Sequence, residues 1–437
     1  MTARPLWEGR TLAILGIVLC AFSLRSAVAS LSPVVDHIAA DFPLPSAVVG
    51  LIGTAPPVCF AVFGLLTPLI ERRLGLERVA VIALAAVTLG LVARGVSVDA
   101  TTLLIGTALV FAGVGMANIL MPPLVKKYFP DRLGLMMTVY TTVMAFSTFL
   151  PPLVAVPVAD ASTWRVSLAM WAVFALAGTI PWLVMLLRER GEKRRSEPEP
   201  EPAAPAVTRE PASFEDAATV STGPIVTAAG ASPRIFARLP RIPLAWALAA
   251  VFGTSSSMAY VAFAWLPSIL VDHAGVTPQT AGLLLSLFAF IGLPASLVVP
   301  LFVVRFRATT VLYVIGATGA LIGIVGMIVA PSPGIAWLWV SLYGLVGLLF
   351  PLALVLISIR ARDPETAVAL SGFVQSVGYT VAAVFPFLFG VLHGATGGWQ
   401  VPLIVLACAL LLSIPAGIMV GRSRTVEADW ERRHGRW

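Results

Sequence analysis

Charged residues are scarce in this sequence. Of its 437 residues, 12% are charged and 58% are hydrophobic, and the mean hydropathy is +0.93. Soluble domains carry about 25% charged residues, so this composition excludes an ordinary water-soluble protein. Apolar stretches of about 20 residues, the length that crosses a bilayer as a helix, recur along the chain. The sequence therefore predicts an all-α membrane protein, with the lipid bilayer as its surroundings and no nucleic-acid partner.

Cysteine is also rare, and patterns for metal or phosphate binding are missing. The three cysteines lie inside apolar stretches, which argues for small packing residues rather than a disulfide framework. No set of His, Cys, Asp or Glu has metal-ligand spacing. No glycine-rich stretch is followed by Lys-Ser or Lys-Thr, which excludes an ATP-driven pump. With no nucleophile–base pair either, we expect no cofactor, no metal and no enzymatic activity.

The apolar stretches divide the chain into two sets of six. The twelve predicted spans are 11–35, 47–70, 78–97, 101–125, 134–159, 165–187, 243–271, 280–304, 309–330, 335–359, 367–391 and 400–420. Between the sets, charge, Pro, Ala and Ser mix without apolar periodicity, which is typical of disorder. The predicted units are an N-terminal six-helix bundle (1–190), a disordered cytoplasmic linker (191–240), a C-terminal six-helix bundle (241–421) and a cytoplasmic tail (422–437).

Basic residues set the predicted orientation. If the N-terminus is cytoplasmic, all 29 Lys and Arg except Arg25, Arg94 and Arg165 fall on the inner side, as the positive-inside rule requires. We therefore expect both termini in the cytoplasm and a protein of the bacterial inner membrane. The basic start and Ala27-Val28-Ala29 also resemble a signal peptide. Because Arg25 interrupts the apolar run before that site, a retained first span is expected.

The two sets of spans repeat one another. Matching pairs recur at offsets of about 232 to 236 residues, and the pairs are Gly50 with Gly282, Pro68 with Pro300, Asp36 with Asp272, Pro151 with Pro386 and Trp164 with Trp399. Parallel repeats of this type enclose a substrate site near the bilayer midplane, and one half rocks against the other. The pattern predicts two pseudo-symmetric six-helix bundles.

Several segments resemble a known family. The layout of six spans, a long loop and six spans is similar to the major facilitator superfamily. The loop from Gly64 to Arg78 resembles its glycine-rich basic signature, with Glu71 near the place of the usual aspartate. Closer likeness to the cyanate/2-nitroimidazole transporter branch is carried by LRSAVASLSPVV, NILMPPLVKKYFPDRLGLMMTVYTT, AWLPSILVDHAGVTPQTAGLLLS and LSGFVQSVGY. The resemblance implies the major facilitator fold and secondary transport of a small solute, by a monomer.

Arg25 is the main candidate for substrate binding. It lies about 14 residues into the first span, roughly 20 Å from the cytoplasmic end at 1.5 Å per residue. A central arginine costs about 2.5–3.5 kcal/mol and nearly always faces an interior or a wet cavity. Its planar fork of donors suits carboxylate-like or other planar electron-rich groups. The alternatives are a structural arginine bonded to Ser23, Ser26 or Ser30, and one that snorkels to the interface.

Polar and aromatic residues inside other spans are further candidates. Asn118 offers an amide to substrate or to a neighbouring helix. Tyr140 and Gln375 occupy equivalent repeat positions, and Tyr379 follows Gln375 by one helical turn. We expect these to line a shared cavity, with packing as the alternative. Trp265 has the shape to stack on a flat substrate, or to anchor at the membrane interface.

Acidic residues are absent from the interior of every predicted span. Without a buried carboxylate, a coupled proton has to travel on the substrate or on His37 or His273; a counter-transported ion is the other option. We expect a secondary or facilitative transporter of a small planar anionic or polar organic solute such as a cyanate-like ion, a carboxylate or a nitro-heterocycle. The alternatives are a drug or metabolite efflux transporter of the same fold and, more remotely, a non-transporting membrane sensor.

Overall fold

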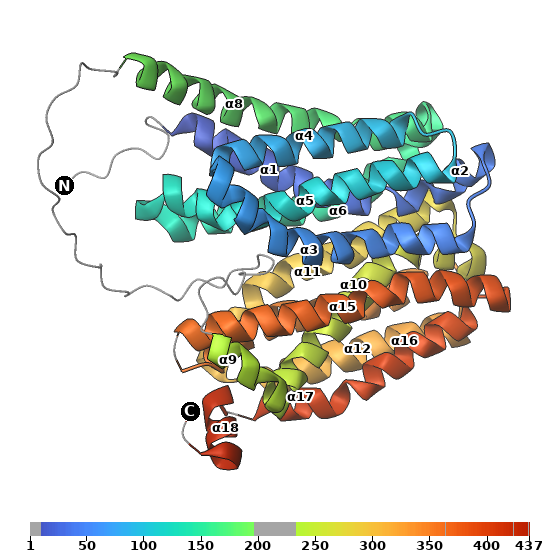
Figure 1. The fold of residues 1–437 in the computed structure, drawn as a ribbon. Coiled ribbons are helices and arrows are strands. Elements are labelled where there is room, and N and C mark those ends of the chain that lie inside the picture. The colour runs from blue at the N-terminus through green and yellow to red at the C-terminus, as the bar shows by residue number, and fades with distance from the viewer. Residues whose placement is uncertain (1–9, 196–232, 363, 423, 436) are drawn as a thin grey trace, which may run out of the picture.

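The computed structural model describes residues 10–195, 233–362, 364–422, 424–435 and 437. Within these ranges, twelve helical segments are long and apolar enough to cross a membrane. They form an elongated bundle in two stacked halves, with α1 to α8 in one half and α10 to α17 in the other (Figure 1). We call the end that carries Arg10 and the C-terminal helix the terminal end, and the opposite end the far end.

The first half contains six spans, some built from two helices in series. Its elements are α1 (Thr11–Ala29), η1 (Ser32–Val34) and α2 (Val35–Asp41); α3 (Ser46–Leu74); α4 (Leu76–Gly95); α5 (Ala100–Tyr128); η2 (Pro130–Arg132) and α6 (Leu133–Ala161); and α7 (Trp164–Ala169) with α8 (Ala172–Arg195). Gly75 joins α3 to α4 with a φ of +86°, a conformation that glycine adopts without strain. Asp99 caps α5 by accepting the Thr102 backbone N–H at 2.7 Å, which holds the pKa of its carboxyl below the usual value.

The second half repeats this arrangement. Its elements are α9 (Pro233–Arg238), η4 (Leu239–Arg241) and α10 (Pro243–Ala274); α11 (Pro278–Phe306); α12 (Thr309–Val329); α13 (Ala336–Gly344), η5 (Leu345–Leu348) and α14 (Leu349–Ile359); α15 (Pro364–Thr396); α16 (Gln400–Leu412) with α17 (Ile414–Gly421); and α18 (Val426–His434). The twelve predicted spans are confirmed, with ends displaced by a few residues. Residues 196–232 of the predicted linker lie outside the described residues, so their disorder and the division into four units stay predictions. The described ends of the linker are helical instead, because α8 continues to Arg195 and α9 begins at Pro233.

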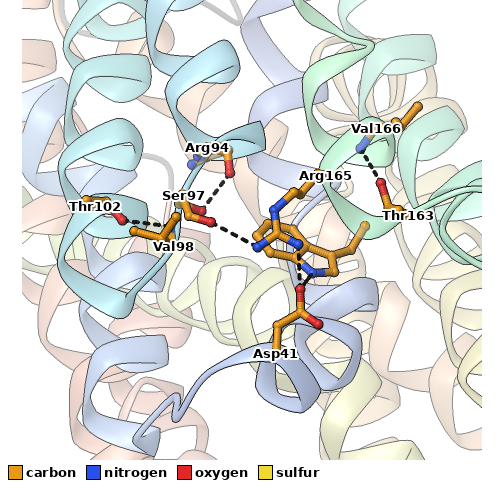
Figure 2. A network of polar contacts seen from close by, with 9 residues as sticks. Asp41, Arg94, Ser97, Val98, Thr102, Thr163, Arg165 and Val166 are labelled. Carbon is orange, nitrogen blue, oxygen red and sulfur yellow. Dashed lines mark hydrogen bonds and ion pairs between the residues drawn. The ribbon is translucent and has the colours of Figure 1, made fainter.

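Each half closes its far end with the same contact between a tryptophan and an aspartate. In the first half the Trp164 indole N–H donates to Asp41 at 2.8 Å, and Arg165 donates to the same carboxylate at 2.5 Å (Figure 2). In the second half the Trp399 indole N–H donates to Asp272 at 3.0 Å. Trp164 and Trp399 are one of the sequence-matched pairs, but their acceptors are not, because the match of Asp272 is Asp36 and Trp164 binds Asp41. The two halves therefore share the kind of contact and the position of its tryptophan, not the position of its aspartate.

The two halves meet at the far end through glycines. A Cβ on Gly50 of α3 would lie 2.8 Å from the Pro386 carbonyl oxygen on α15, and one on Gly282 of α11 would lie 2.7 Å from the Pro152 carbonyl oxygen on α6. Atoms at these distances do not fit, so only glycine permits the approach. The paired helices α3–α15 and α6–α11 pack closely. The far end is therefore closed by two symmetry-related glycine contacts.

Candidate functional site

A cavity of about 230 Å³ lies between the halves. The first half contributes residues of α1 and α6, and the second half contributes residues of α10, α11, α15 and the segment from α13 to α14. Its polar lining residues are Arg25, Thr141, Thr148, Ser255, Ser256, Tyr260, Ser296 and Tyr379, and its aromatic walls include Phe263, Phe288 and Phe350. The mixture of apolar surface with a few polar groups is typical of small-ligand sites.

Arg25 is the charged residue of this lining among the described residues. Its guanidinium has no carboxylate within 4.0 Å in the described part of the chain. Nor do the neighbouring serines occupy it: the Ser23 hydroxyl donates to the Leu19 carbonyl at 2.9 Å, and the Ser26 hydroxyl faces the Ser23 carbonyl at 3.4 Å. Arg25 therefore presents its donors to the cavity.

Two tyrosines share the lining with Arg25. The Tyr260 hydroxyl lies within hydrogen-bond reach of the guanidinium, and Tyr379 belongs to the same cavity lining. The Tyr260 and Tyr379 rings meet edge to face at 6.4 Å. Sequence reasoning missed Tyr260, although the run Ser255 to Ser257, one turn before it, is a polar interruption in an apolar span that signals a lined face.

The other predicted site residues divide between the cavity and its surroundings. Tyr379 lines the cavity, and Tyr140 lies behind the lining, fully buried, with no hydrogen-bond partner for its hydroxyl among the described residues. Gln375 is buried and donates to the Ser371 hydroxyl at 2.7 Å. Trp265 lies away from the cavity, because its indole N–H donates to the Pro386 carbonyl at 2.9 Å within the second half.

Asn118 occupies an unusual position. Its side chain is completely buried in α5, and neither its amide nitrogen nor its amide oxygen has a hydrogen-bond partner among the described residues. Asn118 does not belong to the cavity lining. An unsatisfied buried amide costs about 1–3 kcal/mol, so Asn118 destabilises the conformation seen here.

Arg94, one of the three basic residues that the sequence does not place on the inner side, lies inside the first half. Its side chain, near the end of α4, is fully buried between α1, α4 and α5. Its Nε donates to the Thr107 hydroxyl at 3.0 Å, its Nη1 donates to the Ala27 carbonyl at 2.8 Å, and its guanidinium stands 5.0 Å from the centre of the Phe111 ring. Arg94 thus ties α4 to the turn of α1 that carries Arg25.

The two histidines considered for proton transfer lie at the far end. His37 Nε2 is 2.9 Å from a carboxylate oxygen of Asp160. His273 has a buried Nε2 with no partner among the described residues. Neither histidine lines the cavity, and none of the lining residues is an acid. The cavity as described therefore holds one fixed positive charge and no side chain that titrates near neutral pH.

Comparison with known proteins identifies the family. The family model described as the Major Facilitator Superfamily matches residues 17–386. The chain belongs to the major facilitator superfamily. It is therefore an integral membrane transporter, and the family resemblance read from its sequence is confirmed.

Three relatives and one solved structure place this transporter within the superfamily. It is 30% identical to an uncharacterized transporter, YycB, of Bacillus subtilis over 96% of both chains. It is 30% identical to the 2-nitroimidazole transporter of Escherichia coli, over 96% of this chain and 98% of that one. The cyanate transport protein CynX of Escherichia coli is 23% identical, over 88% of this chain and 91% of the other. A crystal structure of the nucleoside transporter NupG shares the fold, with a TM-score of 0.70, 11% identity and coverage of 94% and 100%.

Proposed function

We propose that this transporter moves a small planar anion, such as a carboxylate or a cyanate-like ion, with Arg25 as the group that binds it. The observation that carries the proposal is the Arg25 guanidinium, which lines the cavity without a carboxylate partner in the described chain. A cation inside a membrane-spanning bundle without a counterion is costly, and an anionic substrate supplies that counterion. Two relatives are named for 2-nitroimidazole, a small flat heterocycle, and for cyanate, a small linear anion.

The walls of the cavity fit the same class of substrate. Aromatic faces such as Phe263 and Phe288, whose rings meet edge to face at 6.0 Å, favour a flat solute. Tyr260 and Tyr379 add hydroxyls that orient it against Arg25. A cavity of about 230 Å³ suits a small solute better than the bulky compounds that drug exporters carry.

The closed far end suggests how the substrate reaches this site. Because the glycine contacts at Gly50 and Gly282 seal that end, we infer access from the terminal end, which the positive-inside rule assigns to the cytoplasm. Rocking of the halves would then open the far end to the outside and complete alternating access. Asn118 and Gln375 are proposed to join the site in that second conformation.

Transport into proteoliposomes tests the proposal. We expect benzoate and cyanate to compete with one another, and benzamide, a neutral molecule of the shape of benzoate, to compete poorly. Arg25→Lys keeps the charge but loses the planar fork, so the anion affinity should fall about tenfold or more, which corresponds to about 1.4 kcal/mol. Arg25→Gln should also abolish the preference for benzoate over benzamide.

The matched control is Arg305→Gln. Arg305 is an exposed arginine at the end of α11 and lies outside the cavity lining, so transport should be unaffected by its loss. If Arg25→Lys transports with unchanged affinity while remaining folded, Arg25 has only a structural role and the proposed substrate class loses its basis.

A further inference from the structure

A second pocket, of about 90 Å³, lies at the terminal end of the second half. We define it as the arginine pocket, and its lining residues are Pro243, Leu244, Met419, Arg422, Arg424, Asp429, Arg432 and Arg433. The pocket is thus lined by four arginines and one aspartate. The transport cavity shares none of these residues.

The helix α18 is what brings these arginines together. Its start is fixed by the Val426 backbone N–H, which donates to the Arg360 carbonyl at 2.9 Å. The Arg362 backbone N–H donates to Glu427 at 2.7 Å, and the Arg362 guanidinium donates to both oxygens of Glu431 at 2.9 Å. The C-terminal segment expected as a plain tail is therefore a helix docked on the loop between α14 and α15.

The docking separates the charges of α18 onto two faces. Glu427 and Glu431, four residues apart, face the α14–α15 loop and are used there. Arg432 and Arg433 come three and four residues after Asp429, so these three share the opposite face, and they line the pocket with Arg422 and Arg424. The glutamates of α18 are thus bonded to Arg362, and its arginines line the pocket.

The pocket has an excess of positive charge. Asp429 pairs with Arg432. The guanidiniums of Arg422, Arg424 and Arg433 have no carboxylate within 4.0 Å in the part of the chain that the structure describes. These arginines are exposed, and arginine forks bind the oxygens of a phosphate group two at a time. The pocket therefore suits a phosphate-bearing anion.

The other wall of the pocket indicates where that phosphate comes from. Pro243 begins α10, the seventh span, and Met419 is in α17, the last part of the twelfth span, so this wall lies where two spans meet the membrane interface. Nearby, the Arg238 guanidinium lies 5.2 Å from the centre of the Trp430 ring, which packs α18 against the segment that leads into α10. We propose that the arginine pocket binds the phosphate headgroup of an anionic phospholipid, with its acyl chains along α10 and α17.

Thermal unfolding of the full-length transporter in neutral detergent tests this site. Added phosphatidylglycerol should raise the midpoint of unfolding by about 3 °C or more, as expected for a ligand well above its dissociation constant. Phosphatidylcholine and inorganic phosphate at the same concentration should leave it unchanged. In Arg424→Gln/Arg433→Gln, the shift with phosphatidylglycerol should fall by at least half.

The control is Arg305→Gln/Arg307→Gln, which removes two exposed arginines at the terminal end of α11, outside the pocket. It should keep the full shift, and native mass spectrometry should count fewer bound phosphatidylglycerol molecules only on the pocket variant. Equal shifts or equal lipid counts for the two variants would overturn the site. An equal shift with inorganic phosphate would overturn the lipid assignment. Neither readout depends on the transported substrate.

Discussion

Arg25 and Arg94 both place a guanidinium inside the membrane-spanning bundle, but the two guanidiniums have different surroundings. Arg94 spends its Nε and Nη1 on the Thr107 hydroxyl and the Ala27 carbonyl. Arg25, half a turn before Ala27, lines the cavity instead. Arg94 therefore helps to position the helical turn that carries Arg25. A guanidinium bonded to a hydroxyl and a carbonyl of neighbouring helices has a structural role, and one that lines a cavity is available to a ligand.

The unsatisfied amide of Asn118 leads to a prediction that separates stability from transport. Asn118→Leu removes a buried, unpaired polar group, so the midpoint of thermal unfolding should rise by about 2–4 °C for each kcal/mol recovered. If the amide meets substrate in the opposite conformation, the maximal transport rate should fall in the same variant. A fluorescence-detected melting curve and an uptake assay measure the two effects.

Thr54→Val is the matched control for that experiment. Thr54 also has a buried hydroxyl without a partner among the described residues, and it does not line the cavity. It should gain stability and keep its transport rate. Should Asn118→Leu behave in the same way, Asn118 is a packing residue and leaves the proposed site.

At the residue level, Arg25 stands out in the sequence because it places a charge in mid-span, where no lipid-facing position tolerates it, and the structure puts it in the cavity lining. The burial of Arg94 has no such signal, because it depends on Thr107 and Phe111 of α5, neighbours that no linear pattern places beside it. Tyr260 was missed for the same reason, since its place in the lining with Arg25 depends on how α1 and α10 lie in the folded bundle.

At the scale of elements, the glycine contacts explain which end of the transporter is closed. Gly50 and Gly282 were matched from the sequence as repeat positions, and Gly50 touches Pro386, the repeat partner of Pro151, while Gly282 touches the adjacent Pro152. The sequence thus predicted the equivalence of these residues. It did not predict that each glycine packs against a proline of the other half, because the pairing of α3 with α15 and of α6 with α11 is a long-range contact.

Gly390 offers a test of this seal. A Cβ at this position of α15 would overlap the Ser46 carbonyl oxygen at the start of α3, and overpacking of this kind costs about 1–3 kcal/mol. Gly390→Ala should therefore disfavour the far-end-closed state and raise labelling of a cavity cysteine, Ser256→Cys, about tenfold. A membrane-impermeant thiol reagent, added from the far side to an otherwise cysteine-free transporter, measures the rate.

Gly394→Ala is the control, one turn further along the same helix. Nothing lies within 4 Å of a Cβ at that position, so helix propensity changes in the same way without a clash. Labelling should stay at the wild-type rate. Faster labelling in both variants would assign the effect to α15 itself, and no change in Gly390→Ala would mean that the far end opens by another route.

At the scale of the whole molecule, each half has its own tryptophan–aspartate contact at the far end, whereas the cavity between the halves is asymmetric. Trp164–Asp41 joins α7 to the end of α2 in the first half, and Trp399–Asp272 joins the start of α16 to the end of α10 in the second. The cavity, by contrast, takes its charge from α1 in one half and most of its aromatic wall from α10, α11 and α14 in the other. Two rigid bodies that share one substrate site are what a rocking transporter requires.

The charge of the cavity predicts how transport responds to voltage. Its described lining has Arg25 and no carboxylate or histidine to carry a proton. One negative charge should therefore cross with each substrate anion. A potential of 100 mV is worth about 2.3 kcal/mol per charge, so an inside-negative potential of that size should lower the equilibrium accumulation of benzoate about 45-fold. Proteoliposomes with a potassium diffusion potential at equal pH on both sides measure this ratio. Accumulation that ignores voltage and follows an imposed pH gradient would contradict the prediction, and it would assign a proton to the far-end pair of His37 and Asp160, where the two side chains lie 2.9 Å apart.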